Sequence, residues 1–403
     1  VLPIFVFDRN ILDKLEDRSD ARVSFLHDRI TALDQELQSL GSSLKVFYGT
    51  PMEAMELLSS AYDVRGVYLN RDYDPYASAR DTDIFEYWTA KNVGVVGAKD
   101  HVIFEKDEVV KADGTPYLVF SPYAKMWRKQ LDVYQYKSYP NHKYFDGFHQ
   151  CDAFQVPSLA SMNFERTGIK IPSGTIDTDI IKRYDETRNF PAQKKGTTKL
   201  GLHLRFGTIS IRALLRHGLQ YNDTFVNELI WRDFFQMALY NFPESREKAI
   251  KPKYDRIVWE NNEDHFKAWC KGKTGYPIVD AGMRELNATG HMHNRVRMIV
   301  ASFLTKHLLI DWRWGEAYFA QKLLDFDLAS NIGGWQWASG SGLDAAPYFR
   351  VFNPTSQMEK FDKDLRYIRK WVPELDTHIY PKPIVEHKWA RERCLARFKE
   401  ALA

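Results

Sequence analysis

Two tryptophans beside a pair of glycines mark the part of this 403-residue sequence that could do the most chemistry. Trp335 and Trp337 flank a single glutamine, and Asp325 and Asp327 lie shortly before them. Glycine allows the backbone to approach a flat ligand closely, and indole rings are costly to place unless they pack, stack or move charge. An isolated W-x-W is most often part of a helical core. The stretch is compatible either with such a core or with a site where a flat ligand binds.

The spacing of the cysteines and histidines does not favour disulfide bonds or a metal site. Cys151, Cys270 and Cys394 are far apart and lack metal-ligand spacing, which fits a reduced intracellular compartment and argues against disulfides or zinc. His291 and His293 are two residues apart, so on a helix they would point to different faces rather than share a metal ion. We expect a cytoplasmic protein without a metal centre.

Length and charge indicate two domains of different character. At 403 residues the chain exceeds the usual size of a single core. No apolar run approaches the roughly 20 residues of a membrane span, and no secretory signal is recognisable. Residues 1–130 carry 16 Lys and Arg against 21 Asp and Glu, whereas residues 131–403 carry 40 against 32. The basic second part suits a polyanion such as nucleic acid, but a solvated surface of mixed charge would look similar.

The elements that must position these residues are of two kinds. Residues 1–130 alternate between apolar β-rich runs and helix-like segments, which predicts a doubly wound parallel α/β sheet. Residues 131–195 show little periodicity and indicate a long connector. Residues 196–403 carry apolar residues three and four apart and are predicted to be helical. Strands are expected at 2–7, 44–48, 67–69 and 93–96, and helices at 212–219, 226–241, 278–287, 294–309 and 315–324.

Several strings of residues, in this order along the chain, resemble motifs of the photolyase/cryptochrome family, specifically the class I branch that repairs cyclobutane pyrimidine dimers. The segment 331–354 is similar to the family's flavin-pocket signature. Further similar strings lie at 184–191 (Y-D-E-T-R-N-F-P), 196–201 (G-T-T-K-L-G), 228–235 (E-L-I-W-R-D-F-F), 293–298 (H-N-R-V-R-M) and 308–313 (L-L-I-D-W-R).

The resemblance covers essentially the whole chain and implies its architecture. It implies an α/β antenna-type domain at 1–130, a connector at 131–195 and a helical FAD-binding and DNA-binding catalytic domain at 196–403. Family members usually open with a further strand ahead of the equivalent of Val1. We therefore expect the sheet to lack its first strand here, and the native protein to be longer.

The same resemblance implies an FAD site in the helical domain. Asp325 and Asp327 are expected near the ribose and the isoalloxazine edge, with Arg297 paired to Asp325 and Asn331 beside flavin N5. A neutral amide at N5 can accept the proton of reduced flavin. Read without the resemblance, the Arg297–Asp325 pair is an ordinary buried ion pair and the segment 196–201 a plain helix N-cap. The remaining expected cofactor-binding residues are Tyr184, Thr197, Thr198, Lys199, Leu200 and Gly201, the last of which stands where the family has Ser.

A site for damaged DNA is implied beside the flavin. Glu228 and Trp231 are three residues apart and would share a helix face. The indole could stack on an unstacked base, and the carboxylate could accept pyrimidine N3–H groups. The residues implied for catalysis are Glu228, Trp231, Met298, Asn331 and Trp337, and those implied for DNA binding are Arg188, Trp231, Asn294, Arg295 and Arg350. Two departures, His291 for Trp and Leu343 for Thr, could retune lesion contact or photoreduction.

Electron supply and light harvesting are implied by two further sets of residues. Trp259, Trp312 and Trp335 match the family's chain of tryptophans from the surface to the flavin, although three packing residues would give the same spacing. The segment 70–81 is similar to that of members with a deazaflavin-type antenna. Tyr76 and Ala77 replace the Asn-Glu pair of folate-binding members. A deazaflavin-type antenna is therefore favoured over folate, and an empty antenna site stays open.

Light-driven repair of cyclobutane pyrimidine dimers is the function that these resemblances favour. The expected partner is UV-damaged DNA, the expected state is a monomer, and no membrane is involved. One alternative is a cryptochrome-type blue-light photoreceptor without repair activity. Another is a flavin-free nucleotide-binding α/β protein, which would stay colourless after addition of FAD.

Overall fold

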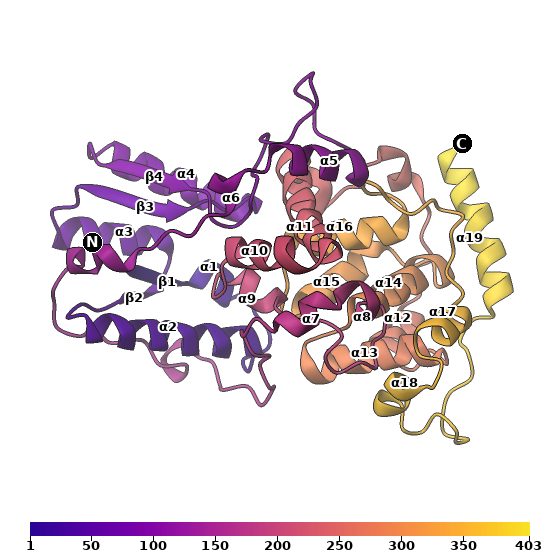
Figure 1. Cartoon of the computed structure of the whole chain (residues 1–403). Coiled ribbons are helices and arrows are strands. Elements are labelled where there is room, and N and C mark those ends of the chain that lie inside the picture. Colours follow the sequence, from indigo (N-terminus) through magenta and orange to yellow (C-terminus); the bar gives the residue numbers. More distant parts are fainter. The chain divides into compact units, whose positions relative to one another are not determined.

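The structure, a computed structural model, describes residues 1–403, which form two compact units (Figure 1). Unit 1 comprises residues 1–101, 137–172 and 206–210, and unit 2 comprises residues 102–136, 173–205 and 211–403. The chain therefore crosses between the units more often than the expected boundaries at 130 and 195 imply. The expected connector is divided between the units: residues 131–136 and 173–195 belong to unit 2, and residues 137–172 belong to unit 1. Some of its apolar side chains are buried in these units. Met162 and Phe164, for example, are in the core of unit 1.

Unit 1 is an α/β unit, as predicted from the alternation of strands and helices. Its elements are β1 (Ile4–Asp8), α1 (Arg9–Leu12), α2 (Ala21–Ser39), β2 (Lys45–Gly49), α3 (Pro51–Ala61), β3 (Gly66–Asn70), α4 (Pro75–Thr89), β4 (Gly94–Ala98), η1 (His142–Gly147) and η2 (Ala160–Met162). Each helix that follows a strand begins at a side-chain cap: Thr50 forms a capping box with Glu53, and Asp74 caps α4 just before Pro75.

The four strands form two separate parallel ladders. β1 pairs with β2 in the register Ile4↔Lys45, and β3 pairs with β4 in the register Gly66↔Gly94. No strand joins the two ladders, so the expected single sheet is divided at its middle. One apolar cluster nevertheless includes residues of all four strands together with α3 and α4. A second cluster packs α2 against β1 and β2, which gives helices on both faces of the strands.

Unit 2 is helical, again as predicted. Its elements are α5 (Phe120–Gln130), α6 (Val133–Tyr136), α7 (Thr178–Lys182), α8 (Tyr184–Thr187), α9 (Gly201–Arg205), α10 (Ile211–Tyr221), α11 (Asp223–Asn241), η3 (Pro243–Arg246), η4 (Pro252–Arg256), α12 (Glu263–Cys270), α13 (Pro277–Thr289), α14 (Asn294–Ser302), η5 (Phe303–His307), α15 (Trp312–Lys322), α16 (Leu328–Ser339), α17 (Pro354–Phe361), α18 (Arg366–Trp371) and α19 (His387–Leu402). The helix expected at 294–309 is α-helical only to Ser302 and continues as the π-helix η5.

A buried carboxylate ties the segment after unit 1 to unit 2. Asp233 on α11 is fully buried and accepts hydrogen bonds from the backbone N–H groups of Ile103 and Phe104 and from Trp127 Nε1. Burial raises the pKa of this carboxyl to about 6. These three donors explain why the chain from residue 102 packs with the helices. Among all the helices, none combines the length and apolar character needed to cross a bilayer.

Candidate active site

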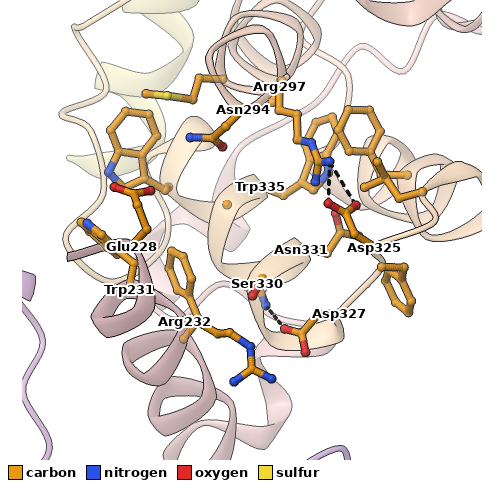
Figure 2. A pocket seen from close by; sticks show the side chains of 18 of the residues that line it. Glu228, Trp231, Arg232, Asn294, Arg297, Asp325, Asp327, Ser330, Asn331 and Trp335 are labelled. Carbon is orange, nitrogen blue, oxygen red and sulfur yellow. Dashed lines mark hydrogen bonds and ion pairs between the residues drawn. The ribbon is translucent and has the colours of Figure 1, made fainter. Parts of the chain in front are cut away.

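A cavity of about 430 Å³ lies in unit 2, between α11, α14, α15 and α16 (Figure 2). Most of the site residues expected from the sequence line it. They are Arg188, Glu228, Trp231, Asn294, Arg295, Arg297, Met298, Asp325, Asp327, Asn331, Trp335 and Trp337. Residues from positions 188 to 337 therefore meet at one place, as the motifs together predicted.

Other expected site residues lie outside the cavity lining. Tyr184 packs edge-on against Phe225, with ring centroids 5.3 Å apart. Gly201 begins α9 beside the cavity, because a Cβ built on it would lie 2.8 Å from Asp325 Oδ2. A side chain at Gly201 would thus press on the Asp325 carboxylate. The residues expected from the sequence that do not line the cavity are Tyr184, Thr197, Thr198, Lys199, Leu200, Gly201, Trp259, Trp312 and Arg350.

The acidic turn before α16 is held by specific partners. Arg297 Nη2 donates to both carboxylate oxygens of Asp325, at 3.0 and 2.9 Å, and its Nε donates to Met292 O at 2.8 Å. Asp327 caps α16 by accepting from Ser330 N at 2.9 Å, and it also accepts from Gln236 Nε2 at 2.9 Å. Both carboxylates therefore have a fixed orientation at the edge of the cavity.

The amide of Asn331 is oriented by a residue that the motifs did not predict. Asn331 Nδ2 donates to Glu316 Oε1 at 2.8 Å and to Glu316 O at 3.1 Å. The amide oxygen is left without a protein donor on the cavity side, so Asn331 presents an acceptor there. Burial raises the pKa of Glu316 above its ordinary value. Glu316 is on α15 and Asn331 is on α16, so no spacing within one helix could have revealed this pairing.

The two glycines of α16 have different roles. A Cβ on Gly333 would lie 2.2 Å from Phe235 Cδ1, so this glycine allows α16 to pack closely on α11. A Cβ on Gly334 would meet nothing within 4 Å, and Gly334 lines the cavity. Only Gly334 therefore leaves room for a flat ligand.

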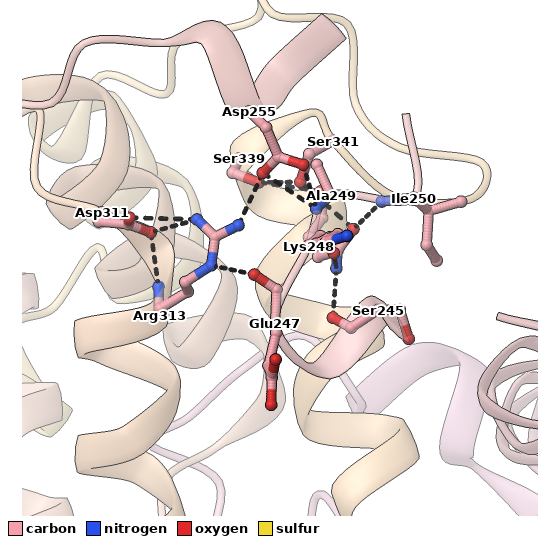
Figure 3. A network of polar contacts seen from close by, with 11 residues as sticks. Ser245, Glu247, Lys248, Ala249, Ile250, Asp255, Asp311, Arg313, Ser339 and Ser341 are labelled. Atoms are coloured by element: carbon pink, nitrogen blue, oxygen red, sulfur yellow. Dashed lines mark hydrogen bonds and ion pairs between the residues drawn. The ribbon is translucent and has the colours of Figure 1, made fainter. Parts of the chain in front are cut away.

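Gln336, between the two tryptophans, faces away from the cavity. Its Nε2 donates to Ser245 O and Lys248 O at 2.8 and 2.9 Å, and its Oε1 accepts from Ile250 N at 2.9 Å. Figure 3 shows the surrounding network, in which Arg313 donates to Glu247 O and Asp255. The segment 245–255 thereby anchors the back of α16 and the start of α15.

Glu228 and Trp231 share one face of α11, as predicted (Figure 2). The Glu228 carboxylate is paired with the Arg188 guanidinium. Burial raises the pKa of Glu228 above its ordinary value, and the Arg188 charge acts in the opposite direction. Trp231 is half-buried and is surrounded on one side by aromatic rings, including Phe235 at a centroid distance of 5.4 Å. The side of the site near α11 combines a carboxylate acceptor with an indole.

The residues expected to contact DNA are held by local contacts. Arg295 Nη2 donates to Asn189 Oδ1 at 2.7 Å, and its guanidinium lies 4.4 Å from the ring centroid of Phe361. Asn294 is exposed at the start of α14, and Arg350 is exposed in the segment after α16. These cationic and polar groups lie on or beside the cavity opening and are accessible to a polyanion.

The three tryptophans of the expected electron route share one apolar cluster. Trp335 lines the cavity and packs against Gly315 of α15, whose Cβ would lie 2.1 Å from the indole. Trp312 is buried at the start of α15, with the Arg313 guanidinium 4.8 Å from its ring centroid. Trp259 is half-buried and packs against the same cluster. Trp335 and Trp312 are therefore the least exposed of the three, and Trp259 is the most exposed.

The two departures and the antenna segment are not part of the cavity lining. His291 Nδ1 is 3.7 Å from Glu285 Oε1, and Leu343 is buried in the core. In unit 1, the Tyr76 hydroxyl donates to Asp8 and accepts from Asn10 Nδ2. These positions do not line the cavity, so any effect of the two departures on it is indirect.

Comparisons with known proteins agree with one another over most of the chain. A sequence model described as the FAD binding domain of DNA photolyase matches residues 225–379, and one described as DNA photolyase matches residues 1–142. The deoxyribodipyrimidine photo-lyase of Synechococcus sp. is 37% identical over 96% of this chain and 84% of its own length. That of Escherichia coli is 36% identical over 87% and 81%.

Solved structures give the same result. A photolyase from Sulfolobus tokodaii, described with two FAD molecules, has a TM-score of 0.85 at 33% identity and covers 99% of this chain and 93% of its own. A class III photolyase from Agrobacterium tumefaciens has a TM-score of 0.81 at 33% identity over 100% and 92%. A Synechocystis cryptochrome at 23% identity shares the fold, with a TM-score of 0.80 over 98% and 92%.

Proposed function

The chain belongs to the photolyase/cryptochrome family, and from this premise we propose that the cavity of unit 2 is the site at which it repairs DNA. The protein is an FAD-dependent enzyme that repairs cyclobutane pyrimidine dimers with light. Bound FAD, reduced and excited by light, supplies the electron that opens the cyclobutane ring and that returns once the ring has split. The residues of the cavity bind, orient and shield the reacting groups.

The residues of the cavity fit FAD. The free Asn331 oxygen can accept a hydrogen bond from flavin N5–H, because Glu316 holds the amide nitrogen. Gly334 leaves open space for the flat ring system, while Arg297 and Asp325 form a polar edge. The segment from Thr197 to Gly201 offers hydroxyl and backbone N–H donors at the edge of the cavity, where Gly201 lies beside Asp325, and we assign the phosphate contact to these donors. Tyr184 completes the proposed cofactor-binding set.

We assign the lesion to the side of the cavity formed by α11. Trp231 and Trp337 offer stacking faces to an extruded dimer, and Met298 offers a soft apolar contact. Glu228 accepts hydrogen bonds from pyrimidine N3–H groups, and its pairing with Arg188 favours the ionised acceptor form. Such a group also stabilises charge that develops as the ring splits.

The DNA backbone is assigned to four polar residues. Arg188 and Arg295 are half-buried and line the cavity, Asn294 lines it and is exposed, and Arg350 is exposed and close enough for its charge to act on Arg295. Charge on these groups would supply the salt-dependent part of the affinity. Within the family we favour class I, a cytoplasmic monomer, and a deazaflavin-type antenna chromophore over folate.

The observation that carries the proposal is that one cavity brings the Asn331 acceptor together with Glu228 and Trp231. To test it, FAD-loaded, reduced protein is irradiated with oligonucleotides containing either a cyclobutane dimer or a (6-4) photoproduct, and restored thymines are measured. We expect repair of the cyclobutane dimer alone. Repair of the (6-4) photoproduct alone, or of neither lesion, would reject the substrate assignment and favour a photoreceptor.

Two variants separate the roles assigned on α11. Trp231→Ala should lower the affinity for dimer-containing DNA by about 10-fold or more, because base stacking contributes about 1–3 kcal/mol. Its weak, salt-sensitive binding to undamaged DNA should change little. Glu228→Ala should reduce the repair yield more than the affinity.

A further inference from the structure

One face of the Trp231 indole is covered by another aromatic ring of unit 2. Phe120, the first residue of α5, stacks on Trp231 with ring centroids 3.8 Å apart and an angle of 3° between the planes. Phe120 does not line the cavity, whereas Trp231 does. That face is thus covered by protein. Phe234 and Phe235 also pack against the indole, with ring centroids 5.6 and 5.4 Å away, and the rest of the ring lines the cavity.

This parallel arrangement is maintained by other contacts. Aromatic pairs prefer offset or edge-to-face geometry over direct face-to-face stacking. Phe234 supports both rings, edge-on, with centroids 5.9 Å from Phe120 and 5.6 Å from Trp231. Phe234 is fully buried and contacts the two rings from one side only.

Asp344, in the segment that follows α16, also restrains the position of Phe120 at the start of α5. Its N–H donates to Leu118 O at 3.0 Å. Burial raises the pKa of its carboxyl, and the nearby backbone N–H of Phe120 acts in the opposite direction. Val119, the N-cap residue of α5, provides no side-chain cap. The Asp344 carboxylate therefore caps α5 from a distant part of the chain and complements the helix dipole. Asp344 has a φ of 44°, a conformation that Asp tolerates better than most residues.

We propose that Phe120 is a positioning residue for the damaged base, held in place by Asp344. Phe120 fixes the plane of the Trp231 ring, so that the part of the indole that lines the cavity is already oriented when an extruded pyrimidine stacks on it. A ring that is fixed before binding loses little rotational freedom when the base arrives. The inference rests on the proposed function, since it assigns the lesion to Trp231.

The test is a double-mutant cycle between Phe120 and Trp231, measured as the affinity of the FAD-loaded protein for dimer-containing and undamaged oligonucleotides. Phe120→Ala should weaken binding of the dimer by about three- to tenfold, with undamaged DNA unaffected. In the Trp231→Ala background the same change should have no further effect, because Phe120 acts through the indole. Phe120→Tyr, which keeps the ring, should restore the affinity.

A matched control separates positioning from a general loosening of α5. Phe104 contacts Trp127, another aromatic residue of α5, edge-on at a centroid distance of 5.4 Å. Phe104→Ala should leave the dimer affinity unchanged in variants that retain bound FAD. Asp344→Ala should reproduce part of the Phe120→Ala loss, whereas Asp344→Asn keeps an acceptor and should not.

The outcomes distinguish this inference from the proposed function. If Trp231→Ala weakens dimer binding but Phe120→Ala does not, the positioning role is rejected and the lesion site stands. An equal loss from Phe120→Ala with and without Trp231 also rejects it. If Trp231→Ala itself leaves dimer binding unchanged, the proposed lesion site at Trp231 is rejected.

Discussion

At the scale of single residues, the orientation of one amide decides what the cavity can accept. Asn331 could present either its nitrogen or its oxygen, and the two hydrogen bonds to Glu316 select the oxygen. An amide without this partner could rotate and place a donor at the same point. The chemistry of the site thus depends on a carboxylate behind it.

Removing the Glu316 side chain should change the protonation state of the one-electron-reduced flavin. Glu316→Leu leaves only the backbone acceptor, so the Asn331 oxygen is less firmly held towards N5–H. The ratio of protonated to deprotonated flavin should fall by about fivefold if one hydrogen bond of about 1 kcal/mol is lost. Absorption spectra recorded during blue-light photoreduction would measure this ratio.

Two further variants serve as comparisons for this prediction. Glu316→Gln keeps a side-chain acceptor and should resemble the wild type. Asn331→Asp, which introduces an acid that can donate a proton, should shift the spectrum towards the protonated form. Spectra of Glu316→Leu identical to those of the wild type would contradict the orienting role.

At the scale of elements, α16 has three different environments along one short segment. Gly333 packs on α11, Gly334 faces the cavity, and Gln336 is bound to the segment 245–250 on the opposite side. Trp335 completes the contact with α15 at Gly315. The helix is therefore fixed on every side except the one that the ligand would use.

The two glycines of α16 should respond in opposite ways to alanine. Gly333→Ala forces a methyl group against Phe235 and should lower the free energy of unfolding by about 1–3 kcal/mol. Gly334→Ala meets open space and should raise the stability of the flavin-free protein by up to about 1 kcal/mol through helix propensity. Its FAD content should nevertheless fall. Denaturation of the flavin-free protein measures the stability, and the flavin-to-protein absorbance ratio measures the FAD content. A Gly334→Ala protein with full FAD content would contradict the placement of the flavin beside Gly334.

At the scale of the whole molecule, we propose that three tryptophans of one apolar cluster in unit 2 form a route from solvent to the cavity. Trp335 and Trp312 are almost fully buried, and Trp259 is half-buried in the same cluster. Indoles in series can pass an electron to a bound flavin, whereas repair uses an electron that the reduced flavin already carries. Photoreduction and repair should therefore depend on different residues.

Replacing the outer tryptophan should separate these two activities. Trp259→Phe should slow photoreduction of oxidised FAD by at least about tenfold, an expectation based on removing one redox-active indole. Repair by chemically pre-reduced enzyme should be unchanged. Trp389, an exposed tryptophan on α19, offers the matched control, and Trp389→Phe should photoreduce at the wild-type rate. If Trp259→Phe photoreduces at the wild-type rate, the electron reaches the flavin by another route.

Much of this molecule follows from local sequence. Apolar residues three and four apart predicted α10, α11, α13 and α15 because a helix face is a property of neighbouring residues. The alternation of strands and helices likewise predicted the α/β character of unit 1. The motifs that resemble those of photolyases also predicted most of the cavity lining, since those residue types reflect the ligand that they surround.

Tertiary structure alone decided how distant segments meet. Neither the pairing of Glu316 with Asn331 nor the Asp344 cap on α5 can be read from spacing, because the partners lie on separate elements. The chain enters unit 2 at residue 102 because a single buried carboxylate, Asp233, offers acceptors to three donors there. Such contacts depend on which surfaces fold against each other, and a local pattern carries no information on that. The sequence therefore determined which residues could form the site, and packing determined which atoms they present.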